Sequence, residues 1–148
     1  MKKIFLLIGF ISFSANLLGQ ILTPVKWSYA AKRLNKKEAV VFIKASINEG
    51  WHIYSVNQKD GGPVKTSFLF SPSTGYNLIG KIIEPRPITK FEKAFGVSVS
   101  YFEQSVVFRQ KIKLLKAGTL VKGKVNFMIC NDEKCLPPED VSFNIPLK

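Results

Sequence analysis

The sequence is poor in the residues that most metal sites and nucleic-acid-binding surfaces require. Its 148 residues contain one histidine, His52, and two cysteines, so a site built from several imidazoles is excluded. Arginine, which reads base edges bidentately, occurs only three times, and the basic residues form no dense run. We therefore expect no metal, no cofactor and no nucleic acid partner. The net charge of +12 is interpreted as a solvated, lysine-rich surface.

The composition is that of one folded domain outside the cytoplasm. Hydrophobic residues make up 46% and charged residues 22% of the chain. Residues 1–19 combine a positive start, an apolar run too short to span a bilayer comfortably, and a small residue before Gln20. This pattern predicts a signal peptide, leaving residues 20–148 as one soluble periplasmic or otherwise extracytoplasmic domain. Disulfides form and persist in such a compartment.

The rest of the chain has the alternation of an all-β protein. Apolar residues recur at every second position from Val106 to Leu114, which is typical of a half-buried strand. Turn residues separate many such segments, and no window has a helical period. The spacing predicts a β-sandwich of two antiparallel sheets. Its expected strands are residues 25–31, 39–47, 51–56, 67–70, 76–83, 97–103, 106–114, 120–130 and 141–147.

The segment from Glu84 to Gly96 breaks the alternation. Its two prolines disfavour regular pairing, so we expect an irregular loop. Phe91 and Phe95 are large apolar side chains for a loop. They are expected either to pack on the sandwich or to cover something.

The two cysteines, Cys130 and Cys135, bracket a stretch of turn residues and precede Pro137-Pro138. Such a pair can come within disulfide range and should oxidise outside the cytoplasm. Closing so short a loop restricts the unfolded chain by only about 2 kcal/mol, which is little for a structural bond. From the residues alone, a redox-active pair and a local structural clip both remain open. A metal site using His52 and Met128 is disfavoured because no further ligand motif is present.

The segment from Cys130 through Leu136-Pro137-Pro138-Glu139 resembles the N-terminal (alpha) domain of the thiol:disulfide interchange protein DsbD. Weaker matches are Gly50-Trp51-His52-Ile53-Tyr54-Ser55, and Phe95-Gly96 followed by Tyr101-Phe102. The resemblance implies an immunoglobulin-like sandwich. It also implies a thiol–disulfide exchange module that relays electrons from a thioredoxin-like donor to periplasmic disulfide proteins, such as isomerases or cytochrome c maturation factors.

The resemblance assigns roles to individual residues. Cys135 corresponds to the cysteine that forms mixed disulfides, and Cys130 to the one that resolves them. The cap loop that shields the pair maps to residues 92–96, with Phe95 as the candidate cap and Phe91 and Gly96 beside it. The remaining residues expected to support the site are Asp132, Glu133, Glu139, Tyr54 and His52.

This sequence departs from the family pattern at several points. The loop between the cysteines is one residue shorter, one aromatic of the cap is Ala94, and His52 replaces a tyrosine. The membrane segment and thioredoxin-like domain are missing, so a separate membrane electron conduit is expected and the chain would be only one component of a protein-disulfide reductase. Acidic neighbours, offset only by Lys134, predict a sluggish thiolate. The rival hypothesis is a non-catalytic periplasmic binding or adaptor sandwich with a structural disulfide.

Overall fold

The computed structural model describes residues 22–147, and every regular element within this range is a β-strand. The predicted signal peptide, residues 1–19, lies outside the described residues. Among residues 22–147, no helix is long and apolar enough to cross a bilayer. The strands are β1 Val25–Arg33, β2 Glu38–Ile47, β3 His52–Tyr54, β4 Ser67–Phe70, β5 Tyr76–Ile83, β6 Ile88–Glu92, β7 Val97–Glu103, β8 Ser105–Leu114, β9 Leu120–Phe127, β10 Ile129–Cys130 and β11 Glu139–Pro146.

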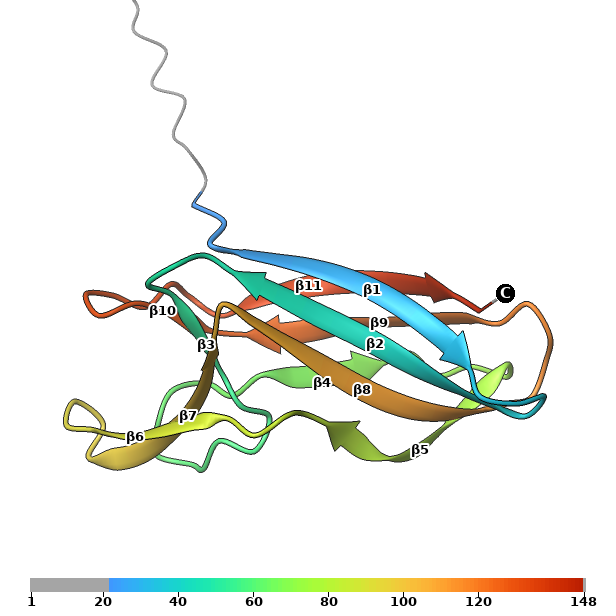
Figure 1. The fold of residues 1–148 in the computed structure, drawn as a ribbon, viewed down its shortest axis with the longest axis horizontal. Coiled ribbons are helices and arrows are strands. Elements are labelled where there is room, and N and C mark those ends of the chain that lie inside the picture. Colours follow the sequence, from blue (N-terminus) through green and yellow to red (C-terminus); the bar gives the residue numbers. More distant parts are fainter. Residues whose placement is uncertain (1–21, 148) are drawn as a thin grey trace, which may run out of the picture.

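Two antiparallel sheets face each other and enclose the main core. One has the strand order β1-β2-β8-β5 and the other β11-β9-β4 (Figure 1). Aromatic rings from the two sheets pack against each other. The ring centroids of Trp27 on β1 and Phe127 lie 5.2 Å apart, and those of Phe68 on β4 and Phe108 lie 5.0 Å apart. Buried aromatic side chains of this size are a principal source of stability. The predicted all-β sandwich is therefore confirmed.

Strand β8 runs through the middle of the larger sheet and follows the predicted alternation closely. Val106, Phe108, Ile112 and Leu114 are buried. Gln110 is the polar exception in this row, and its amide group donates hydrogen bonds to the carbonyls of Ile79 and Lys111, at 3.1 and 2.9 Å. Burial of the amide is therefore compensated.

A third antiparallel sheet, with the order β10-β3-β7-β6, was not predicted; it lies at one end of the sandwich (Figure 1). It forms because the chain passes between this sheet and the main sheets at two points, after β7 and after β9. β7 is followed directly by β8, separated by Gln104 in a left-handed conformation with φ 58°. β9 ends at Phe127, and after Met128 the chain pairs with β3 instead.

Two sequence predictions are corrected by this third sheet. The continuous strand 120–130 is wrong: it is interrupted at Met128, and Ile129 and Cys130 pair with β3, where Cys130 is buried beside Tyr54 and Val99. The irregular loop 84–96 is wrong at residues 88–92, because β6 pairs with β7 along its whole length, whereas residues 84–87 and 93–96 are not strand. The prolines Pro85 and Pro87 precede β6, and β6 is an edge strand, where proline is tolerated nearby.

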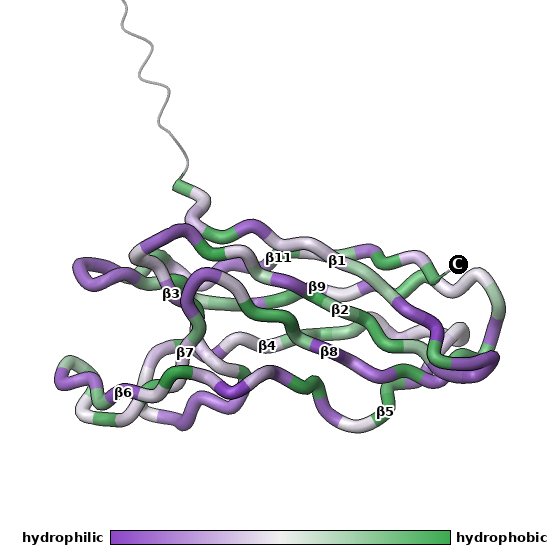
Figure 2. Tube along the Cα trace, viewed as in Figure 1, coloured by the Kyte–Doolittle hydropathy of each residue, from purple (hydrophilic) through white to green (hydrophobic). Residues whose placement is uncertain are grey.

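Hydrophilic residues gather in the β1–β2 turn and in the loop between the cysteines, at opposite ends of the sandwich (Figure 2). The β6–β7 turn and the loop between the cysteines project from the end that carries the third sheet (Figure 1). The β1–β2 and β8–β9 turns lie at the opposite end. The molecule is elongated, and the loop between the cysteines and the β1–β2 turn lie at its opposite ends.

Candidate functional site

Cys130 and Cys135 form a disulfide across a tight hairpin at the end that carries the third sheet. The side chain of Asn131 shapes this hairpin: its Oδ1 accepts hydrogen bonds from the backbone N–H groups of Glu133 and Lys134, at 3.0 and 2.8 Å. Such a turn is the usual role of asparagine. The backbone N–H of Leu136 donates to the carbonyl of Ile129, at 2.9 Å, and closes the hairpin.

The two cysteines differ in their access to solvent. They are partners in an antiparallel bridge, and their Cα atoms lie 4.0 Å apart. Opposed residues in antiparallel strands approach to about 4.5 Å, so an antiparallel bridge brings two cysteines close enough to be joined by a disulfide. Cys130 is only 2% exposed, whereas Cys135 is exposed. An approaching protein would therefore meet Cys135 before Cys130.

His52 and Tyr54 lie on β3, directly beside Cys130. His52 is the register partner of Cys130, and its Nε2 lies 3.1 Å from the hydroxyl of Tyr54. The ring of Tyr101, on β7, lies 4.9 Å from the His52 ring. Sequence analysis selected His52 and Tyr54 but gave Tyr101 no role in the site.

Burial shifts the pKa values of His52 and Tyr54 so that each side chain favours its neutral form. Desolvation lowers the pKa of His52, although the negative charges of Glu103, Asp132 and Glu92 oppose the shift. Desolvation also raises the pKa of Tyr54 to about 12. The histidine–tyrosine pair is therefore an uncharged floor beside the disulfide at neutral pH.

The turn between β6 and β7 supplies the other wall of the site. The backbone N–H groups of Phe95 and Gly96 donate to the carbonyl of Glu92, at 3.2 and 2.9 Å. Gly96 has φ 67°, a left-handed conformation that glycine adopts without strain. This turn places Phe95, 41% exposed, on the same hollow as the cysteines.

A hollow of about 430 Å³ lies between the two loops. Most of the residues proposed from the sequence line it together: His52, Tyr54, Phe95, Cys130, Asp132, Glu133 and Cys135. Three do not line it. Glu139 begins β11 opposite Phe127, while Phe91 and Gly96 line a separate hollow on the other side of the β6–β7 hairpin.

The side chains of Lys90 and Glu92 also line the hollow; Lys90 was not predicted from the sequence, and Glu92 was included only as the first residue of the cap loop. The Lys90 ammonium lies 3.1 Å from a Glu92 carboxylate oxygen, and this contact raises the pKa of Lys90. Lys134 is thus not the only cation near the cysteines. Lys90 and Glu92 stand two residues apart on one face of a strand, and recognising β6 would have identified them.

The two sulfur atoms lie in a hollow that also holds aromatic and charged side chains. Among residues 22–147, no group of three or more histidine, cysteine or carboxylate side chains is placed to hold an ion. What the hollow offers is one accessible sulfur, one sheltered sulfur, an aromatic wall and charges of both signs.

The chain matches a family model described as the N-terminal domain of the thiol:disulfide interchange protein DsbD, over residues 20–146. No curated protein sequence matches it.

Solved structures with a similar fold include N-terminal domains of ScsB and DsbD. The N-terminal periplasmic domain of ScsB from Proteus mirabilis is 17% identical, with a TM-score of 0.60, over 81% of this chain. The match spans only 45% of that ScsB chain. The reduced DsbD N-terminal domain of Neisseria meningitidis is 18% identical, with a TM-score of 0.52, over 74% of this chain and 82% of that one.

A third structure holds the DsbD N-terminal domain of Neisseria meningitidis in complex with the PilB N-terminal domain. It is 16% identical to this chain, with a TM-score of 0.55, and the match covers 84% of this chain and 87% of that one. At these identities the likeness concerns the fold, and it confirms the predicted immunoglobulin-like sandwich.

Proposed function

The chain belongs to the DsbD N-terminal domain family, whose members take part in thiol–disulfide exchange, and from this premise we propose that it carries electrons through its Cys130–Cys135 pair. In this proposal the reduced pair passes two electrons to periplasmic disulfide proteins. A thioredoxin-like donor then reduces the pair again.

The unequal exposure of the two cysteines is the observation that carries the proposal. An exchange centre needs one sulfur that a partner can reach and a second close enough to release that partner. Cys135 is exposed and Cys130 is buried directly behind it, with the two already bonded. The disulfide also lies within one hairpin, so it can open without separating the two main sheets.

The exchange runs in two balanced steps. The thiolate of Cys135 attacks one sulfur of the partner's disulfide, forming a mixed disulfide and releasing the partner's other sulfur as a thiolate, which takes up a proton. The Cys130 thiol then loses its proton, and its thiolate attacks the Sγ of Cys135. This step re-forms the Cys130–Cys135 bond and releases the partner's second thiolate. The pair has lost two electrons and the partner has gained them.

The cap and the nearby charges regulate access in this proposal. Phe95 stands on the wall of the hollow and shields the sulfurs from small oxidants until a partner displaces it. Asp132 and Glu133 line the same hollow and disfavour a thiolate, so the free pair reacts slowly. Neutral His52 and Tyr54 provide the floor against which Cys130 is held.

The proposed partners follow from the family and its solved complex. The meningococcal DsbD domain binds the PilB N-terminal domain, and we propose that this chain likewise docks thioredoxin-like domains over the hollow. DsbD N-terminal domains are periplasmic, and we propose cleavage of residues 1–19 to release this domain there. In this proposal a membrane conduit supplies electrons to the thioredoxin-like donor.

Trapping of the mixed disulfide tests the proposal. A Cys130→Ala variant should accumulate a covalent complex through Cys135 when it is incubated with a thioredoxin-like domain that keeps only its exposed active-site cysteine, activated as a mixed disulfide with thionitrobenzoate. No second cysteine then remains on either protein to resolve the complex. The matched Cys135→Ala variant keeps only the buried sulfur and should form far less complex. Absence of complex with Cys130→Ala, while a control dithiol protein is trapped, would contradict the proposal and favour an adaptor with a structural clip.

A further inference from the structure

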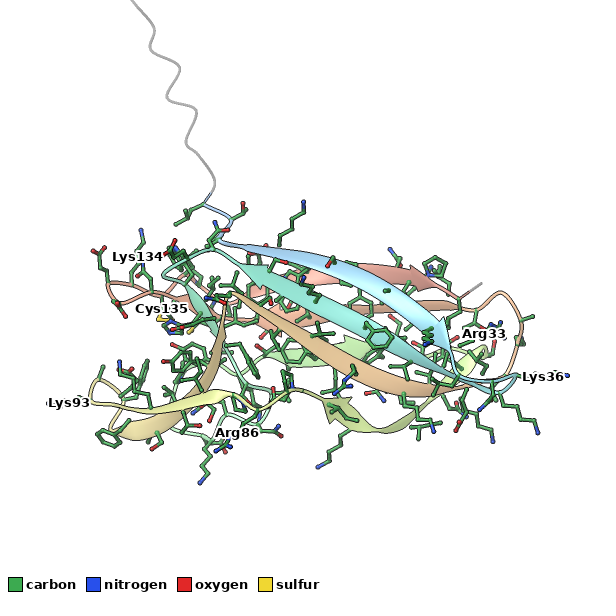
Figure 3. All side chains as sticks on the ribbon, viewed as in Figure 1. Arg33, Lys36, Arg86, Lys93, Lys134 and Cys135 are labelled. Atoms are coloured by element: carbon green, nitrogen blue, oxygen red, sulfur yellow. A yellow bond between two sulfur atoms is a disulfide. The ribbon has the colours of Figure 1, made fainter. Side chains whose placement is uncertain are left out.

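The end of the sandwich opposite the disulfide carries a cationic hollow of about 480 Å³. Five basic residues line it: Arg33, Lys36, Lys37, Lys113 and Lys116. All five are exposed. They come from the β1–β2 turn, the end of β8 and the β8–β9 turn, and Arg33 and Lys36 mark this end in Figure 3, far from Cys135.

Backbone contacts fix these turns relative to one another. The N–H of Leu114 donates to the carbonyl of Lys37, at 2.7 Å, and the N–H of Leu115 donates to the carbonyl of Gly75, at 2.9 Å. The Lys116 ammonium donates to the hydroxyl of Thr74, at 3.2 Å. The basic side chains therefore extend from a rigid frame.

Acidic residues are almost absent from this end. Glu38 is the only aspartate or glutamate before residue 49, and there is none from residue 104 to 131. The Glu38 carboxylate is already held, since its oxygens lie 2.9 Å from the Lys111 ammonium and 3.2 Å from the Asn35 amide nitrogen. The charges of the four lysines that line the hollow are therefore not neutralised by Glu38, the carboxylate nearest in sequence to the β1–β2 turn.

Two leucines stand exposed among these cations. Leu34, in the β1–β2 turn, is 50% exposed, and Leu115, which lines the hollow, is 48% exposed. Binding of a soluble anion would require only the cationic side chains. A bilayer surface also offers an apolar layer beneath its headgroups, into which such side chains can insert.

We propose that this cationic end docks on the surface of an anionic phospholipid bilayer. Headgroup phosphates would occupy the hollow, and Leu34 and Leu115 would reach the acyl boundary. Juxtamembrane basic residues add their attraction to anionic lipid, and salt screens it. Docking in this way points the Cys130–Cys135 disulfide away from the membrane, because the sites lie at opposite ends. The proposal does not depend on the redox role.

Sedimentation with vesicles tests the proposal directly. The purified protein should co-sediment with phosphatidylglycerol vesicles at low salt and not with phosphatidylcholine vesicles. A Lys36→Gln, Lys37→Gln, Lys116→Gln variant should bind about tenfold more weakly or worse, since three of the five cations are lost. The matched control exchanges Lys26, Lys44 and Lys59, which are exposed elsewhere, for glutamine and should bind within about twofold of the wild type.

The apolar component is tested separately. Leu34→Ser combined with Leu115→Ser should weaken binding to phosphatidylglycerol vesicles without changing thermal unfolding. Absence of wild-type binding to these vesicles, or equal losses in the two lysine variants, would overturn the proposal. One combined result would also overturn the proposal: the leucine variant binds normally, and inositol hexakisphosphate at matched ionic strength removes the wild type from the vesicles. That result would assign the hollow to soluble polyanions.

Discussion

Cys130 and Cys135 face each other across one antiparallel bridge, yet only Cys135 reaches the surface. Because a buried thiol reacts slowly, the two cysteines should differ in alkylation once the bond is reduced. In single-cysteine variants, we expect Cys135 to react with iodoacetamide about tenfold faster than Cys130. Mass spectrometry of timed samples gives both rates. Equal rates would show that the hairpin opens freely on reduction.

Phe95 should protect the disulfide from small molecules. Replacing it by alanine removes one wall of the hollow, so reduction by dithiothreitol should become faster. Because the ring is partly exposed, the free energy of unfolding should fall by less than about 1.5 kcal/mol.

Phe91→Ala is the matched control for Phe95→Ala. Phe91 belongs to the same hairpin and is 59% exposed, but it lines a different hollow. Its removal should leave the reduction rate unchanged. Similar acceleration in both variants would mean that general loosening of the hairpin, not the Phe95 ring, controls access.

His52 should make stability depend on pH in the mildly acidic range. Burial lowers its pKa in the folded state, so the unfolded chain binds a proton first as the pH falls through about 6.5. Stability is therefore full above that value and is progressively lost as the pH falls toward the lowered, folded-state pKa. Denaturation of the wild type at pH 7.5 and 5.5 should show this loss.

A His52→Gln variant should lose the part of the pH dependence that belongs to the imidazole. Its amide cannot titrate, while carboxylates contribute equally in both proteins. The difference in unfolding free energy between wild type and variant should therefore change from pH 7.5 to 5.5. A constant difference would contradict the buried, neutral histidine beside Tyr54.

Phe108 should be among the most sensitive core positions. It is fully buried, and its ring meets those of Trp27 on its own sheet and Phe68 on the facing one. Phe108→Ala should lower the free energy of unfolding by about 3–5 kcal/mol. Val107 lies next to it on the opposite, exposed face, and Val107→Ala should cost less than about 1 kcal/mol in the same urea titration.

Period-two alternation made the main sandwich predictable. Strand β8 shows it from Val106 to Leu114 because one face meets the core and the other meets solvent. Strand β6 has no such contrast: its residues are mostly exposed on both faces, so hydrophobic pattern could not reveal it. Pairing with β7, a tertiary contact, decides its structure.

The candidate site was partly predictable for the same reason. Cys130 and Cys135 were identified by their short spacing and the prolines that follow. The burial of Cys130 was not, because it depends on Tyr54 and Val99, residues distant in sequence that cover Cys130 in the third sheet. Glu139 is the last residue of the motif in sequence. In the structure it begins β11 as the register partner of Phe127, and it does not line the hollow.

The reduction potential of the Cys130–Cys135 couple tests the central claim most directly. Equilibration in dithiothreitol or glutathione buffers, with the oxidised fraction measured by thiol trapping, gives its value. A carrier should have a potential between about −120 and −280 mV, the range of catalytic pairs. A value well below about −300 mV, typical of structural disulfides, would contradict electron transfer through this pair.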